Sequence, residues 1–114
     1  MSTPVPPPLD DDARRSASAR AVANRRSRAA LKARVTAREL TLAEAFEVAD
    51  ADPALRDTRV ADLLTAVPRV GPKRAQRILR QCHVAEGRRV GGTGPRQREA
   101  LVRAVAAPHV GDRR

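Results

Sequence analysis

The sequence predicts an all-α protein in which a long basic N-terminal helix precedes a small helical domain. Apolar residues recur at helical spacing in four segments, and no segment shows the sustained alternation that a strand requires. Gly and Pro gather in two short turns between such segments. A chain of 114 residues fits one small domain. Because Phe46 is the only aromatic residue, we expect a modest core built mainly from Ala, Val and Leu.

The N-terminal part is expected to combine a disordered arm with a basic helix. Residues 1–12 are rich in Pro and Asp and have little to bury, which favours disorder. Residues 13–39 are rich in Ala and Arg and contain neither Gly nor Pro, so they are predicted to form one helix. Apart from Glu39, every charged residue of this helix is basic. The cations on it that we expect to make secondary contacts with a polyanion are Arg25, Arg28, Lys32 and Arg34.

The second predicted helix begins after Thr41 and ends near Pro53. Thr41 followed three residues later by Glu44 is typical of a capping box. The apolar positions that then share one face are Leu42, Ala45, Phe46 and Ala49. Acids outnumber bases between residues 41 and 67, so this part is expected to face away from a polyanion.

Three further helices are predicted in the C-terminal half. Thr58 is a plausible cap for a helix that runs through Val67. Pro72 suits the first position of a helix that reaches about Cys82, and Pro95 suits the first position of the last helix. The helical domain is therefore expected to span residues 40–105, and residues 106–114 are expected to form a short tail.

The charge of the chain indicates a polyanionic partner. Lys and Arg total 23 against 13 Asp and Glu, which gives a formal net charge of +10. Such an excess favours nucleic acid or an anionic membrane surface. A membrane role is disfavoured, because no bulky apolar face accompanies the basic residues and no apolar run is long enough to span a bilayer. The start of the chain lacks the pattern of a signal peptide, and we expect a cytoplasmic location.

The two Gly- and Pro-containing turns, PRVGPK and RRVGGTGPR, are the most informative segments. Glycine allows a backbone N–H to come close to another surface. A helix that begins just after such a turn presents free N–H groups and the positive end of its dipole, which favour phosphate. Each glycine alone could simply end a helix. Two such turns flanked by Arg favour contact with a nucleic-acid backbone.

These motifs resemble those of a known family. The run V-P-R-V-G-P-K-R-A resembles a helix-hairpin-helix turn, although Arg69 stands where the first hairpin glycine is usual. Together with G-R-R-V-G-G-T-G-P-R-Q it resembles a helix-two-turn-helix unit over residues 58–105. The Arg-rich first helix and the segments 63–79 and 88–94 are similar to the actinobacterial integration host factor family. That family is unrelated to the two-subunit bacterial host factor of the same name.

The resemblance implies a nucleoid-associated protein that binds duplex DNA with little sequence preference. It implies contacts of the two turns with the backbone and minor groove, effects on DNA bending or topology, and a role in chromosome organisation. The residues expected to contact DNA are Arg69, Val70, Gly71, Lys73, Arg74, Arg77, Arg88, Arg89, Gly92, Thr93, Gly94, Arg96 and Arg98.

Other functions stay open but are less favoured. The same unit can hold duplex RNA or belong to a ribosome-associated module, and it also occurs in DNA repair glycosylases. Those enzymes need a catalytic domain for which this chain has no room, so we expect no enzyme activity. His83 and His109 lack the companions of a metal site, and neither a metal nor a cofactor is expected. Since no exposed apolar stripe is left over, a monomer is expected.

Overall fold

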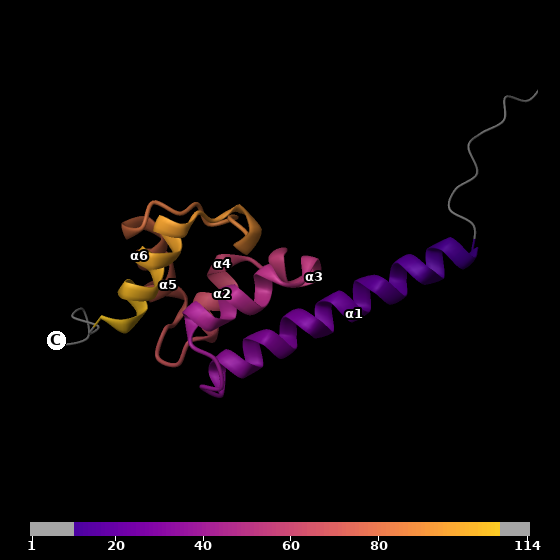
Figure 1. The fold of residues 1–114 in the computed structure, drawn as a ribbon, viewed down its shortest axis with the longest axis horizontal. Helices are drawn as coiled ribbons and strands as arrows, with labels where there is room; N and C mark the ends of the chain where they lie inside the picture. Colours follow the sequence, from indigo (N-terminus) through magenta and orange to yellow (C-terminus); the bar gives the residue numbers. More distant parts are fainter. Residues whose placement is uncertain (1–10, 108–114) are drawn as a thin grey trace, which may run out of the picture.

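The fold is a long helix joined to a compact group of shorter helices (Figure 1). A computed structural model of the protein describes residues 11–107. Within that range the backbone forms no strand, only an isolated antiparallel bridge between Arg59 and Arg89. The helices are α1 (Asp11–Thr36), α2 (Leu42–Asp50), α3 (Pro53–Arg56), α4 (Val60–Ala66), α5 (Pro72–Gln81), the 3-10 helix η1 (Val90–Gly92) and α6 (Pro95–Ala106).

Helix α1 starts earlier and ends earlier than the predicted range of 13–39. Asp11 and Asp12 lie in its first turn, where their charge favours the helix dipole. The helix ends at Thr36 because Arg38 adopts a positive φ of 64°, and the following N–H groups of Glu39 and Leu40 bond back to the carbonyl of Arg34. The expected arm at residues 1–12 and the tail at 106–114 lie largely outside the described residues.

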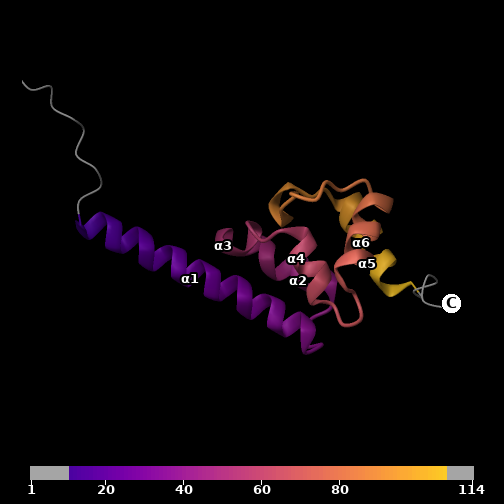
Figure 2. The ribbon, with the colours of Figure 1, turned by 180° about the vertical axis from the view of Figure 1, so that it is seen from behind.

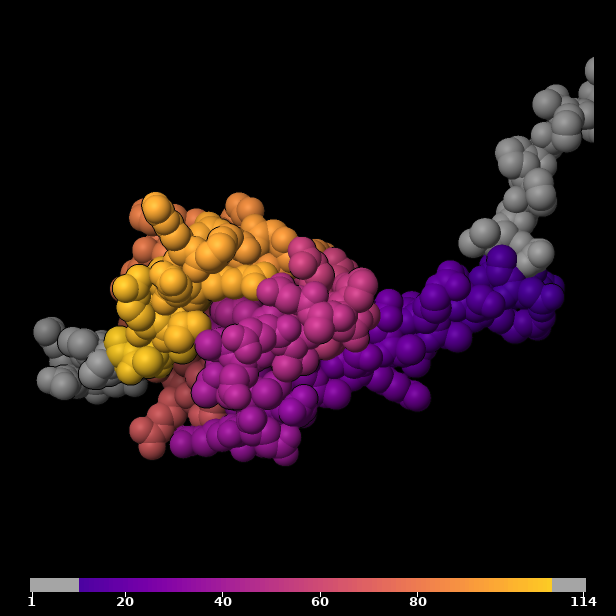
Figure 3. Space-filling view, viewed as in Figure 1, coloured from indigo at the N-terminus to yellow at the C-terminus, as the bar shows by residue number. Residues whose placement is uncertain are grey.

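Only the C-terminal half of α1 packs on the domain. Figures 1 and 2 show this half lying along α4, α2 and α3, while the N-terminal half extends past them. Leu31 and Val35 are the buried residues of α1, and both join the main core. The rest of the core comes from α2 to α6, with Phe46, Leu63 and Leu101 nearly inaccessible to solvent. The domain therefore holds the C-terminal half of α1, and the basic N-terminal half extends beyond the packed helices (Figure 3).

The cap of α2 is confirmed, and the cap of α4 is different from the prediction. Thr41 Oγ1 accepts a hydrogen bond from the N–H of Glu44, while the Glu44 carboxylate accepts one from the N–H of Thr41. Helix α4 begins after Arg59 instead of Thr58. Thr58 cannot cap it, because its side chain points into the core, where the hydroxyl has no hydrogen-bond partner. The four-residue α3, capped by Asp52, was not predicted.

Helices α5 and α6 form the antiparallel pair that positions both turns. At one end the Arg74 side chain donates to the carbonyl of Ala107 over 2.9 Å, and at the other the Gln97 amide donates to the carbonyl of His83 over 3.3 Å. Both helices begin with the proline that the sequence indicated. Because the helices are antiparallel, their N-termini lie at opposite ends of the pair (Figure 1).

Candidate nucleic-acid interface

Each of the two turns is closed by a hydrogen bond between residues three positions apart. In the first, the N–H of Val70 donates to the carbonyl of Val67 over 3.0 Å. In the second, the N–H of Thr93 donates to the carbonyl of Val90 over 3.1 Å. Val70 and Thr93 are both buried, so each turn is anchored in the core by the residue just before its glycine. The anchored turns hold the starts of α5 and α6 in fixed positions.

The N-termini that follow are nearly identical in conformation. Gly71 caps α5 with φ −83° and ψ 176°, and Gly94 caps α6 with φ −82° and ψ 165°. A proline follows each glycine, and then a basic residue whose side chain is exposed, Lys73 or Arg96. The first turn of a helix carries N–H groups without intrahelical partners, and its dipole end is positive. Each start therefore combines backbone donors with an exposed cation.

Neither capping glycine is required by the protein's own packing. A Cβ built on Gly71 or on Gly94 would have nothing within 4 Å, and no described glycine has a positive φ. Alanine would therefore fit inside the molecule at both positions. The missing side chain instead leaves open space outside the helix start, which lets an external group approach the N–H groups closely.

The turns use some of the expected phosphate donors internally. The N–H groups of Val70, Gly92 and Thr93 all donate to carbonyls within their own turns, and the expectation that these three residues contact DNA stays a prediction. At the second helix start, the Gly94 N–H donates to the Gln97 side chain over 3.2 Å. Gly71 is followed by Arg74 at the matching position, which offers no acceptor. The start of α5 therefore lacks the side-chain hydrogen bond that occupies the capping N–H of α6.

Arg69 accounts for the departure from the usual hairpin pattern. Its φ is 71°, the left-handed conformation that glycine adopts at little cost. With Pro68 before it and the Val67–Val70 hydrogen bond closing the turn, the segment has the form of a type II turn. The hairpin therefore keeps the backbone that a glycine would give, and it carries an exposed guanidinium at its tip.

The arginines of the second turn also build the turn. Arg88 donates to the carbonyl of Gly92 over 2.9 Å, and Arg89 donates to the carbonyl of Asp57 over 2.6 Å. Arg89 also lies 3.5 Å from the Asp57 carboxylate. Both side chains remain exposed at their outer edges, so they are able to meet an anion while they hold η1 in place.

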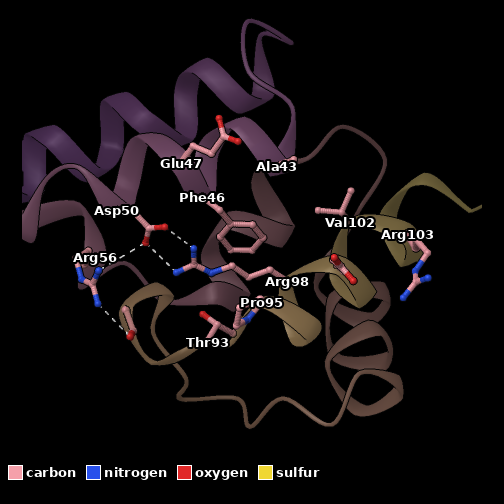
Figure 4. A pocket seen from close by; sticks show the side chains of 12 residues that line it. Ala43, Phe46, Glu47, Asp50, Arg56, Thr93, Pro95, Arg98, Val102 and Arg103 are labelled. Carbon is pink, nitrogen blue, oxygen red and sulfur yellow. Dashed lines mark hydrogen bonds and ion pairs between the residues drawn. The ribbon is translucent and has the colours of Figure 1, made fainter.

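Arg98 has a structural position that the sequence did not indicate. Figure 4 shows its side chain lying across the Phe46 ring and pointing at Asp50, in a groove of about 730 Å³. The guanidinium carbon is 5.2 Å from the ring centroid. Two hydrogen bonds join it to the Asp50 carboxylate, and a third, of 2.9 Å, joins it to the Val90 carbonyl. The side chain of Arg98 is thus turned toward Asp50 in this structure, and its expected contact with DNA stays a prediction.

The remaining predicted cations of α5 differ in availability. Lys73 is exposed and forms no hydrogen bond or ion pair with a described residue. Arg74 is half-buried and bonded to the end of α6, so it fixes the helix pair. Arg77 is exposed on the same helix. Of these three, Lys73 is the side chain best placed to meet an anion at the helix start.

Two of the α1 cations lie beside the second turn. A small crevice of about 230 Å³ brings Arg28 and Lys32 of α1 together with Arg59 and Arg89. Asp57 and Asp62 also line it, so the positive charge of the four cations is only partly offset by the two carboxylates. Arg59 was not among the predicted residues, and no local pattern marks it. By contrast, Arg25 is exposed along α1, and Arg34 lies 3.5 Å from the Glu39 carboxylate at the other end.

A metal site and a membrane span each have requirements that the described residues do not meet. Over residues 11–107, no group of three His, Cys, Asp or Glu side chains is placed to hold a metal ion. Cys82 is half-buried, and burial raises the pKa of its thiol. None of the described helices has the length and apolar character needed to cross a bilayer.

Comparisons with known proteins place these features in a family. Residues 35–105 match the S13-like H2TH domain. The integration host factor of Mycobacterium tuberculosis is 40% identical over 96 residues, which cover 84% of this chain and 91% of that protein. The integration host factor of Streptomyces coelicolor is 34% identical over 97 residues, covering 85% and 91%.

A solved structure shares the fold as well as the sequence similarity. It is that of sIHF bound to an 8-base-pair palindromic DNA, with a TM-score of 0.71 and 33% identity. The similarity covers 74% of this chain and 94% of that one. The all-helical fold and the resemblance drawn from the two turns are thus confirmed. The chain belongs to the integration host factor family and carries its S13-like H2TH domain.

Proposed function

We propose that this protein is a nucleoid-associated protein that binds duplex DNA with little sequence preference. The helix starts at Gly71 and Gly94 would each hold a phosphate of the DNA backbone. The surrounding cations would neutralise the adjacent phosphates. The cations placed for this role are Arg69, Lys73, Arg88, Arg89 and Arg96, with Arg28, Lys32 and Arg59 extending the surface along α1.

The repeated helix start is the observation that carries the proposal. Gly71 and Gly94 share one backbone conformation, precede a proline and a basic residue, and leave open space where a side chain would stand. Phosphate fits such a site because N–H groups and the helix dipole both favour negative charge. Two copies at opposite ends of one helix pair suit a polymer that carries phosphates at regular intervals. The DNA-bound structure of the relative sIHF supports the same partner.

Weak sequence selectivity follows from which atoms face outward. Helices α5 and α6 direct their ends outward, whereas base reading in the major groove requires a helix or a ribbon to lie in the groove. Contacts from N–H groups and guanidinium groups to phosphate fix position but carry no sequence information. We therefore propose that the protein acts on the shape and topology of DNA.

A salt titration tests the proposal. Affinity for a fluorescent duplex of mixed sequence is measured by anisotropy at increasing salt concentrations. Each neutralised phosphate contributes about −0.9 to the slope of log K against log salt. Two helix starts and their cations predict a slope steeper than about −3 by this rule. A flat slope, or no binding at low salt, would contradict the proposal. Duplex RNA of the same sequence is the matched control, and stronger binding to it would favour an RNA partner.

Absence of catalysis and a nucleoid location complete the proposal. The relatives are named integration host factor, and no enzyme name occurs among the matches reported above. Incubation with supercoiled and with damaged duplex DNA is expected to leave the strands intact on a denaturing gel. A fluorescent fusion in living cells is expected to follow the DNA stain, and uniform spread through the cytoplasm would contradict the location.

A further inference from the structure

Arg69 holds a backbone conformation that costs energy. Among residues 11–107 only Arg38, Arg69 and His83 are non-glycine residues with positive φ. The left-handed conformation costs a residue with a Cβ roughly 1–2 kcal/mol. Arg38 and His83 follow the ends of α1 and α5, whereas Arg69 lies in the turn that leads into the start of α5. Strain of this kind is often retained at functional sites.

Nothing within the described protein repays that cost through the Arg69 side chain. The side chain is exposed and forms no hydrogen bond or ion pair with another described residue. The turn itself is closed by the backbone of Val67 and Val70, which a glycine at position 69 would also allow. The guanidinium is therefore free for a partner outside the chain, two residues before the open cap at Gly71.

The second turn has no such side chain. Val70 and Thr93 occupy matching places, so the residue that corresponds to Arg69 is Gly92. A Cβ on Gly92 would lie 3.3 Å from the Arg88 side chain, which fills the space there. The two helix starts are alike in their backbone but differ at the preceding position, where the first turn alone carries a long cation.

This inference rests on the proposed DNA binding. We propose that Arg69 enters the minor groove and gives the protein a modest preference for A·T-rich duplex. A phosphate held at Gly71 lies at the edge of a groove, and a side chain two residues earlier is within reach of the groove itself. The minor groove, about 6 Å wide, admits one extended side chain from a turn, whereas major-groove reading uses a whole helix or ribbon.

The chemistry of arginine favours the narrow form of that groove. A-tracts have a narrow minor groove with enhanced negative potential, which attracts inserted arginine. A guanidinium is more weakly hydrated than an ammonium, so it loses less on entering a confined space. The exocyclic amino group of guanine projects into the minor groove and would obstruct it. One inserted side chain predicts a preference of about fivefold, which remains weak selectivity.

Three duplexes of equal length separate this contact from general DNA binding. One contains A·T pairs at its centre, one contains G·C pairs, and one contains inosine·C pairs. Inosine·C pairs present the major groove of G·C but lack the minor-groove amino group. The wild-type protein is expected to bind the A·T and inosine·C duplexes about fivefold more tightly than the G·C duplex.

Substitutions at Arg69 then identify the side chain responsible. Arg69→Gly is expected to bind all three duplexes equally, at the affinity that the wild type shows for G·C or slightly below it. Arg69→Lys keeps the charge and is expected to lose most of the preference, while Lys73→Ala is expected to weaken binding to all three by one common factor. Circular dichroism confirms that each variant keeps its helices.

The possible results distinguish this inference from the proposed function. Equal binding of the wild type to all three duplexes would overturn the role of Arg69 and leave DNA binding intact. The same holds if inosine·C behaves like G·C, or if Arg69→Gly keeps the preference. No binding to any duplex at low salt would instead overturn the proposed function itself.

Discussion

The guanidinium of Arg98 on α6 holds the Asp50 carboxylate at the end of α2 through two hydrogen bonds of 2.5 and 2.9 Å. The same guanidinium donates to the Val90 carbonyl, so one side chain ties α2, α6 and the second turn together. Arg56 adds to this group, since it lies 3.7 Å from Asp50 and donates to the Gly91 carbonyl over 3.3 Å. The position of the second turn thus depends on a small charged network inside the domain.

Breaking this pair is expected to destabilise the domain. Arg98→Met keeps most of the apolar contact with Phe46 but removes the hydrogen bonds, and we expect a loss of about 2 kcal/mol in the free energy of unfolding. Asp50→Asn should cost less, because Asp50 is more exposed than Arg98. Urea unfolding of both single variants and the double variant gives the coupling between them. Purely additive effects would show that the pair contributes nothing jointly.

The pair also predicts how stability depends on pH. The hydrogen bond from Arg98 lowers the pKa of the Asp50 carboxyl below its ordinary value of 3.8, and the charges of Arg98 and Arg56 add to this effect. Capping by Thr41 lowers the pKa of Glu44 in the same direction. A carboxyl whose pKa is lower in the folded state stabilises the fold fully above its unfolded pKa, and this contribution is lost as pH falls through the folded pKa.

The loss should therefore occur below about pH 4. Thermal melts of the wild type between pH 2.5 and pH 6 are expected to show a falling Tm in this window. Asp50→Asn should have a lower Tm at pH 6 and a shallower acid decline, because it has no carboxylate to protonate there. A variant that declined as steeply as the wild type would indicate that other carboxylates carry the effect.

The capping glycines should be dispensable for folding and necessary for binding. Gly71→Ala and Gly94→Ala place a methyl group in open space, so the free energy of unfolding should change by less than about 0.5 kcal/mol. The methyl group occupies the position from which a phosphate would approach, and we expect affinity for duplex DNA to fall about tenfold by loss of roughly one charged hydrogen bond. Gly87→Ala is the control, because its surroundings are equally open but it caps no helix. Unchanged affinity in both cap variants would contradict the proposed phosphate sites.

The basic residues that follow Pro72 and Pro95 should contribute equally to the affinity for every DNA sequence. Lys73→Ala and Arg96→Ala are each expected to reduce the salt slope by about 0.9 and to weaken binding uniformly. Neither forms a hydrogen bond or ion pair with a described residue, so Tm should stay constant. Arg103→Ala is the matched control, since it removes an exposed cation near the opposite end of α6. An equal effect of Arg103→Ala would indicate that only net charge matters.

The buried hydroxyl of Thr58 is expected to weaken the native fold. Thr58 is only 2% exposed, and its Oγ1 is inaccessible to solvent and has no hydrogen-bond partner. Thr58→Val has the same shape and removes the unsatisfied group, so the free energy of unfolding should rise by about 1 kcal/mol. Thr65→Val is the control, because the Thr65 hydroxyl donates to the Asp62 carbonyl on an exposed face. A destabilised Thr58→Val would show that the hydroxyl has a partner in solution.

Local signals in the sequence were sufficient for most helix boundaries. The Thr41 and Glu44 capping box, Pro72 and Pro95 act through the backbone of their own turns, and the structure confirms all of them as helix starts. Thr58 failed because residue type alone does not show whether a hydroxyl faces a helix start or the core. The short α3 was missed because four residues leave no periodic pattern.

The positions of the arginines depended on contacts that are distant in sequence. Arg98 resembles any cation in the first turn of a helix, and only the packing of α2 against α6 places Phe46 and Asp50 beneath it. The one available signal was the spacing of Phe46 and Asp50, which puts a ring and a carboxylate on one helix face. Arg59 meets Arg28 and Lys32 across three elements, and no pattern local to any of them predicts that crevice.

Because α5 and α6 pair in antiparallel fashion, the ten-residue length of α5 influences the spacing of the two glycine-capped helix starts. Since a helix rises about 1.5 Å per residue, the ten residues of α5 place its two ends roughly 15 Å apart. One added residue would lengthen α5 and turn one of its ends by about 100° relative to the other, because an α-helix has 3.6 residues per turn. A change in the length of α5 would therefore alter how the two glycine-capped helix starts are placed relative to each other.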